Sequence, residues 1–162
     1  MGLKLEDKNA PALQLASSIL SGQGGRLFLK LRDEQSLAYT VAPIEFYGIE
    51  PGYFGIYIGC APEKVAQAQE GIQKELDLIS SKTPPKSEVE RSKRYLLGRL
   101  AIDSQRNSSI ATSMAISELV GEGFDHQWKF PELMQKVTPE NVRQVTESVF
   151  SGNSVTSIVS PS

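Results

Sequence analysis

The sequence predicts an α+β fold in which helices cover one face of a mostly antiparallel sheet. Two segments, residues 38–47 and 53–60, are rich in strand-forming residues, and GIEPG between them favours a turn. The segments before and after them carry apolar residues at spacings of three and four, which indicates helices with one buried face. A strand pair flanked by such helices is typical of an α+β domain.

The first helix is expected over residues 12–20, where apolar side chains follow Pro11. The glycines of SGQGG permit positive φ and lead into a short amphipathic helix over residues 26–34. This glycine run is neither a phosphate-binding loop nor a dinucleotide fingerprint, because the G-K-[ST] ending and the preceding strand are missing. Arg32 lies in the last turn of the short helix.

The second strand segment alternates between two faces. Phe54, Ile56 and Ile58 share one face, and Tyr53 and Tyr57 share the other, which predicts a sheet with one buried side. A helix that opens at Pro62 should cover that side, because its apolar residues recur at helical spacing. They are Val65, Ala68, Ile72, Leu76 and Ile79.

The second half of the chain reads as helices. Ser87 and Glu90 have the spacing of a capping box and predict the start of a long helix. Its apolar pattern pauses at DSQRNSS and resumes over residues 110–120, with Gly121 and Gly123 after it.

Two shorter helices and a strand are expected to complete the chain. One helix covers residues 131–136, and the other begins after Thr138, which can cap it, with Pro139 in the first helical position. The segment SVTSIVS near the end predicts a last strand that returns to the sheet.

Composition indicates a soluble globular protein of one domain, although two small domains would fit the length. Of the 162 residues, 40% are hydrophobic and 22% charged, and 17 basic side chains against 19 acidic ones give a formal charge of −2. Arg91, Lys93 and Arg94 stand beside glutamates on one predicted helix, so they indicate a solvated helix face and not a nucleic-acid site. No apolar run approaches the roughly 20 residues of a membrane span, and no signal peptide is recognisable.

A metal site on this chain is not expected. One cysteine, Cys60, excludes an intramolecular disulfide and every cysteine-cluster site. The one histidine, His126, stands in a polar loop and cannot build a zinc site by itself, since such a site normally needs three or four protein ligands, although carboxylates could supplement it. Nothing in the sequence aligns His126 as a base for Cys60, which reads as a small buried residue at a strand end.

Arg32 and Tyr39 are the candidate functional residues. They lie seven positions apart, across the junction between the short helix and the first strand. An arginine fork beside a phenol suits binding of a carbonyl, a carboxylate or a developing oxyanion. Taken alone, the two residues are more often a solvated helix-end arginine and a packing tyrosine than a binding pair.

Four stretches together resemble the pitrilysin or insulinase family of zinc peptidases, and specifically its non-catalytic domain of the C-terminal type. The resemblance runs from about Ala12 to Val159, and the block around Arg32 and Tyr39 is its most specific part. The stretches are GGRLFLKLRDEQSLAYTV, GYFGIYIGCAPEKV, SEVERSKRYLLGRL and TPENVRQV.

The resemblance implies the function. In this family one domain carries zinc on an H-x-x-E-H helix, and a related domain faces it; this sequence contains no H-x-x-E-H, so it is not expected to be catalytic alone. The resemblance assigns peptide carbonyl binding and oxyanion stabilisation to Arg32 and Tyr39. It implies that zinc is bound by a partner domain, in the same full-length chain or in a separate subunit. The alternative is a proteolytically inactive structural or assembly subunit of the same fold.

The resemblance also sets expectations about the chain's extent. Residues 1–11 read as a polar lead without the family's first strand, and residues 12–160 as one non-catalytic domain, so the chain resembles a fragment of a longer bacterial protein of the cytoplasm or periplasm. An unpaired sheet edge would invite pairing with a second copy, giving a homodimer. Where the family often has Gly before the Ala-Tyr pair, this chain has Ser36 and Leu37.

Overall fold

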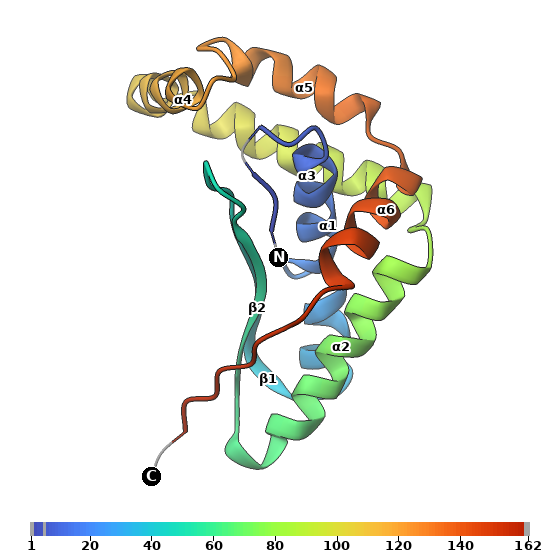
Figure 1. The fold of residues 1–162 in the computed structure, drawn as a ribbon. Coiled ribbons are helices and arrows are strands. Elements are labelled where there is room, and N and C mark those ends of the chain that lie inside the picture. Colours follow the sequence, from blue (N-terminus) through green and yellow to red (C-terminus); the bar gives the residue numbers. More distant parts are fainter. Residues whose placement is uncertain (1, 5, 161–162) are drawn as a thin grey trace.

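The computed structural model describes residues 2–4 and 6–160 and has the predicted α+β architecture (Figure 1). Strands β1 (Ala38–Phe46) and β2 (Tyr53–Cys60) form an antiparallel hairpin, and the helices lie on one side of it. The helices are α1 (Ala10–Leu20), η1 (Phe28–Asp33), η2 (Pro62–Lys64), α2 (Val65–Ser81), α3 (Lys86–Asp103), α4 (Asn107–Leu119), α5 (His126–Lys136) and α6 (Pro139–Phe150).

The hairpin has the two different faces that its alternating pattern predicts. Phe54, Ile56 and Ile58 pack against the buried core, whereas Tyr53 and Tyr57 on the other face are more than half exposed. The helices therefore cover one side of the hairpin only.

The first residues of the chain bind to the hairpin turn through backbone hydrogen bonds. The Gly2 N–H donates to the Gly52 carbonyl at 2.9 Å, and the Gly52 N–H donates to the Leu3 carbonyl at 3.1 Å. Lys4 forms a parallel bridge with Gly48, and Leu3 packs against the core. The segment predicted as a polar lead thus has a structural role at the turn.

Helix α1 is the centre of the core. It contacts β1 on one side and α3, α5 and α6 on the others, and eight of its eleven residues are buried. A helix that is apolar nearly all round is one that is enclosed by other elements. Its fully enclosed side chains include Leu13, Leu15, Ile19 and Leu20.

Two buried polar side chains join the outer helices. Thr146 in α6 is fully buried, and its Oγ1 donates to the Ile79 carbonyl of α2 at 3.0 Å. Lys93 in α3 donates to the Gln135 carbonyl of α5 at 3.1 Å and pairs with Glu90. Both groups therefore have the partners that burial requires.

The predicted last strand is wrong. Residues 153–160 form no strand, and they are exposed throughout, with Val155 and Val159 each 96% accessible. Strand propensity reflects the packing of a pleated surface, and these side chains have no surface to pack on.

Two predictions about the helix starts are wrong, and one is confirmed. The capping box at Ser87 and Glu90 is absent, because α3 already begins at Lys86, with the extended Pro85 as its N-cap residue, so Ser87 lies inside the helix. A capping box exists instead at Thr138, which confirms its predicted role: its Oγ1 accepts from the Asn141 N–H at 3.2 Å. His126 does not lie in a loop, because α5 begins there and continues through Pro131.

The long helical pattern of residues 87–120 is divided. Helix α3 ends at Asp103 and α4 begins at Asn107, so the polar DSQRNSS stretch holds the break. Gly121 and Gly123 both have a φ of +86° after α4, as expected of glycines that end a helix. In the part of the chain that the structure describes, no helix is long and apolar enough to cross a membrane.

Candidate functional site

The segment that carries Arg32 is a π-helix and not the expected α-helix. Residues 26 and 27 begin with an α-helical turn, and η1 then widens over Phe28–Asp33. Leu27 and Leu31 are fully buried, which confirms the predicted apolar face. π-Helical turns are rare and occur frequently at functional sites.

The structure brings Arg32 and Tyr39 together. The Arg32 Cζ lies 5.8 Å from the centroid of the Tyr39 ring and 4.7 Å from that of the Phe28 ring. A cation this close to an aromatic face is held electrostatically. Within the described residues the Arg32 side chain has no carboxylate partner, so its N–H donors remain available.

A β-bulge aims the Tyr39 side chain. Ala38 pairs with Cys60 and Thr40 pairs with Gly59, so Tyr39 is an extra residue with no partner across the hairpin. Strict alternation would bury one of two consecutive residues, yet Tyr39 and Thr40 are both exposed, Tyr39 by 85%. Bulges re-aim side chains in this way and are common beside active sites.

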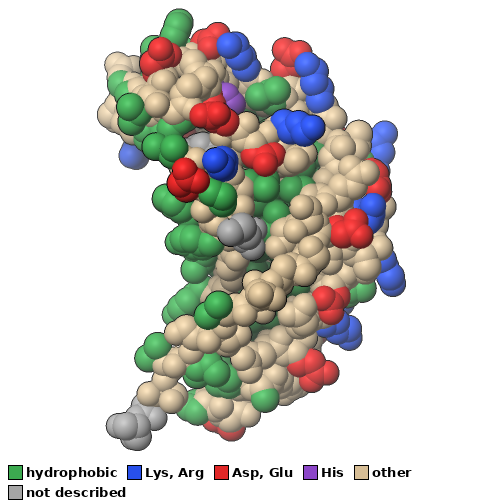
Figure 2. Space-filling view, viewed as in Figure 1, with side chains coloured by type: hydrophobic (Ala, Val, Ile, Leu, Met, Phe, Trp, Pro, Cys, Tyr) green, Lys and Arg blue, Asp and Glu red, His purple; other side chains and the backbone are tan. Residues whose placement is uncertain are grey.

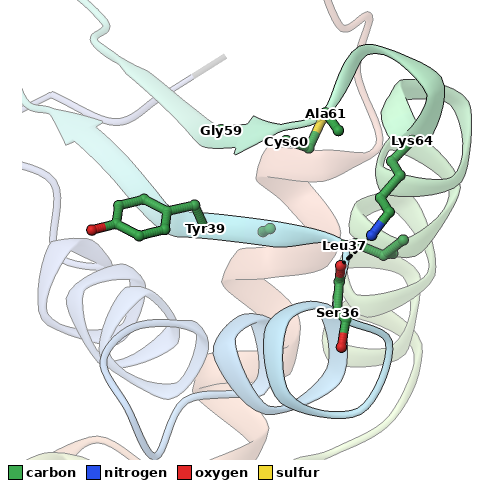
Figure 3. Close-up of a pocket in the computed structure, with 8 residues that line it drawn as sticks. Ser36, Leu37, Tyr39, Gly59, Cys60, Ala61 and Lys64 are labelled. Atoms are coloured by element: carbon green, nitrogen blue, oxygen red, sulfur yellow. Dashed lines mark hydrogen bonds between the residues drawn. The ribbon is translucent and has the colours of Figure 1, made fainter.

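Ser36 makes the sharp junction between η1 and β1. Its φ is +52°, in the left-handed region, and the flanking N–H groups of Ser36 and Leu37 donate to the carbonyls of Arg32 and Leu31. This is the capping arrangement that usually employs glycine, which explains why glycine would suit this place in the family. The Lys64 Nζ donates to the Ser36 carbonyl at 2.8 Å (Figure 3).

Relief of this backbone conformation gives a stability prediction. We expect Ser36→Gly to raise the free energy of unfolding by about 0.5–1 kcal/mol, because glycine adopts positive φ without a Cβ clash. For a chain of this size that raises Tm by about 1–4 °C, measured by thermal unfolding. Ser36→Ala is the control and should give no gain, since alanine keeps the Cβ.

Residues 26–33, the segment that carries Arg32, are joined to α3 by a bidentate ion pair. The Arg26 Nη2 and Nε donate to the two carboxylate oxygens of Glu88 in α3, at 2.6 and 3.0 Å. Both side chains are largely buried, and the pair raises the pKa of Arg26. Such bidentate pairs add geometric specificity, so η1 has a defined orientation on α3.

Glu75 is a buried carboxyl beneath the same segment. It lies in α2, is 5% exposed, and is close enough to Arg26 and Lys30 to feel their charges. Burial raises its pKa above the ordinary 4.5, and the neighbouring cations offset only part of that effect. Because the folded state keeps this proton to a higher pH than the unfolded state, the stability that Glu75 contributes is complete below its ordinary pKa and is lost as pH rises through the raised pKa.

We therefore expect Glu75→Gln to have a higher free energy of unfolding than the parent chain at neutral pH. Above pH 4.5 the free energy of unfolding should fall less steeply in Glu75→Gln than in the parent, because glutamine does not ionise. Urea unfolding between pH 4 and 8 measures both effects. Glu70→Gln, at an exposed position of the same helix, is the control. Equal pH slopes in the parent and Glu75→Gln would contradict the prediction.

A shallow hollow lies beside the Arg32 and Tyr39 pair, and the Tyr39 ring extends away from the Ser36 and Lys64 side of it (Figure 3). Cys60 ends β2 at this hollow and is partly buried. His126 lies 3.6 Å from Glu122, through its Nδ1, and no hydrogen bond joins it to Cys60 in the described residues. The hollow is lined by Ser36, Leu37, Ala38, Tyr39, Gly59, Cys60, Ala61 and Lys64.

Sequence reasoning missed three residues that shape the site. Phe28 lies four positions before Arg32, and that spacing on a helix was a usable signal for contact. Ser36 could be found only from the expected glycine at its position. Lys64 is 28 residues from Ser36 along the chain, and nothing local predicts their hydrogen bond.

The chain is similar to a known family of protein domains. The family model described as the peptidase M16 inactive domain matches residues 2–96, more than half of the chain. The chain therefore belongs to the peptidase M16 inactive-domain family, which confirms the predicted membership.

Relatives and solved structures agree with this placement. An uncharacterized zinc protease of Streptomyces coelicolor is 26% identical over 164 residues, covering 99% of this chain and 35% of that protein. A protease of Helicobacter pylori has the same fold, with a TM-score of 0.81 and 16% identity, over 92% of this chain and 36% of that one. A peptidase M16 inactive domain of Pseudomonas fluorescens has a TM-score of 0.78 and 22% identity, and the match covers 91% of this chain and 35% of that one. The chain thus spans about a third of each.

Proposed function

We propose that this chain is the substrate-binding, non-catalytic part of a zinc-dependent endopeptidase, in which Arg32 and Tyr39 bind a peptide carbonyl opposite a zinc-bearing domain. The observation that carries the proposal is the meeting of the two side chains. Arg32 lies over the Tyr39 ring, both are exposed, and the Arg32 donors have no carboxylate partner in the described residues. A scaffold has no need of such a pair.

The pair can perform one chemical task. On this proposal the N–H groups of Arg32 and the hydroxyl of Tyr39 donate to the carbonyl oxygen at the scissile bond. As water attacks, negative charge grows on that oxygen, and donors already in place stabilise it more than they stabilise the neutral carbonyl. The π-helix, the bulge and the Arg26–Glu88 pair hold these donors in place beforehand.

No candidate zinc site is found among the side chains that the structure describes. The sequence has one histidine, and within residues 2–4 and 6–160 no group of three His, Cys, Asp or Glu side chains could hold a metal ion. The metal of a zinc peptidase activates the attacking water. In the proposal that metal is bound by the partner domain, within the same full-length chain or in a separate subunit.

The test is complementation. Peptide hydrolysis in the presence of zinc would be measured for this chain, for the zinc-bearing domain encoded in the same genome, and for their mixture. Activity confined to the mixture supports the proposal. A partner that binds this chain, shown by sedimentation, but gains no activity from it would overturn the proposal in favour of a structural or assembly role.

A further inference from the structure

The hairpin has an exposed face, turned away from the helices, that continues from Arg32 and Tyr39. We call it the outer face. Tyr53 and Tyr57 are more than half exposed on it, as is Phe46, and Ile44 is 44% exposed. Figure 2 shows hydrophobic side chains gathered along this side of the molecule. The outer face consists of Thr40, Ala42, Ile44, Phe46, Tyr53, Gly55, Tyr57 and Gly59.

The outer face contains no charged residue, in a chain that is 22% charged. A charged side chain placed against this face would lose water and find no partner there, so the face favours uncharged groups. Phe46 and Tyr53 stack at the turn end, with ring centroids 5.7 Å apart. Arg32 and Tyr39 stand at the opposite, open end, where β1 begins.

The shape of the outer face suits a single extended chain. It is two strands wide and runs from Thr40 to Phe46, a length of about 20 Å, which corresponds to about six extended residues. Glycines alternate with the tyrosines of β2: Gly55 lies between Tyr53 and Tyr57, and a Cβ built on it meets no atom within 4 Å. Such gaps accept the side chains that an extended peptide projects toward the sheet.

We propose that the outer face is a binding track for an extended, uncharged and apolar stretch of the substrate, which runs from the Arg32 and Tyr39 pair toward the hairpin turn. This inference rests on the proposed function, because it takes the carbonyl held by that pair as one end of the bound segment. The track then determines specificity: substrates with alternating apolar residues beside the scissile bond bind better than charged ones.

Gly55→Thr is the decisive variant. Gly55 has ordinary strand backbone and open space above it, so threonine fits the fold and suits a strand better than glycine does. Its side chain would fill the gap between Tyr53 and Tyr57 and obstruct the peptide. Gly98→Thr in α3, where a Cβ also meets no atom within 4 Å, is the matched control on a different surface.

The probe is an acetylated, amidated decapeptide with Phe and Val at alternate positions and Ser between them; in the control peptide Glu replaces Phe and Val. Binding to this chain is measured by fluorescence anisotropy and by ¹H–¹⁵N spectra. We expect the apolar peptide to shift the amides of the outer face and of Tyr39. Gly55→Thr should weaken its binding about tenfold or more without lowering Tm, and Gly98→Thr should bind as the parent does.

Unchanged binding by Gly55→Thr, or equal binding of the Glu peptide, would overturn the track. A second copy of the chain is the other candidate occupant of the outer face, and sedimentation at the same concentration tests it. If the parent chain is a dimer that Gly55→Thr dissociates, the outer face is a dimer interface and the proposed binding track is wrong. The track and the proposed function fail separately. If Arg32→Ala abolishes hydrolysis in the assembled peptidase while Gly55→Thr leaves peptide binding intact, only the track is wrong.

Discussion

In a peptidase assembled from this chain and its zinc-bearing domain, we expect Arg32→Ala to lower kcat by about a hundredfold, or roughly 3 kcal/mol of transition-state stabilisation. The reason is that the N–H groups of Arg32 are paired with no carboxylate in the described residues, and they lie near Tyr39, whose hydroxyl is a second donor. Donors that stabilise an oxyanion act mainly in the transition state, so kcat should fall more than KM rises. Steady-state kinetics on one peptide measures both constants.

The controls for Arg32→Ala separate chemistry from folding. Arg32 is exposed, so its removal should leave the urea midpoint of this chain nearly unchanged. Arg99→Ala, at an exposed position of α3, should keep full activity. Tyr39→Phe keeps the ring beneath Arg32 and removes only the hydroxyl, so it should also lower kcat. Full turnover by both Arg32→Ala and Tyr39→Phe would remove this pair from the mechanism.

Local patterns predicted most of the fold because each reports one physical preference. The alternation in residues 53–60 reports a sheet with one covered face, and Phe54, Ile56 and Ile58 do pack on the core. Thr138 followed by Pro139 reports a helix start, and α6 begins there. The pattern of SVTSIVS reports only strand propensity, which without a packing surface forms no strand.

The candidate residues could be named from the sequence, and their site role stays a prediction, but their geometry could not be foreseen. Arg32 and Tyr39 were identified from a family resemblance, since neither residue type is diagnostic alone. Their meeting depends on three features that local periodicity does not encode: a π-helix, a left-handed Ser36 and a bulge at Tyr39. Each of these features is a local irregularity of one residue or of one shift in the hydrogen-bond pattern. Contacts between distant parts of the chain, such as the hydrogen bond from Lys64 to Ser36, occur at the same junction.

The turn before the Arg32 segment gives the largest stability prediction. Gly25 is buried, and a Cβ built on it would lie 2.0 Å from the Ser21 carbonyl oxygen and 2.7 Å from the Ser21 nitrogen. These are backbone atoms at the end of α1, so no side-chain rotation relieves the clash. We expect Gly25→Ala to lower the free energy of unfolding by about 3 kcal/mol, at the upper end of the cost of overpacking.

Gly24 supplies the matched control for this prediction. A Cβ on Gly24 would meet only the end of the Arg91 side chain, at 4.0 Å, so Gly24→Ala should leave stability within about 0.5 kcal/mol of the parent. Urea unfolding of the two variants compares neighbouring glycines with the same substitution. Equal midpoints would show that the turn relaxes freely; a large loss in Gly25→Ala alone would show that the α1 turn fixes the start of the segment carrying Arg32.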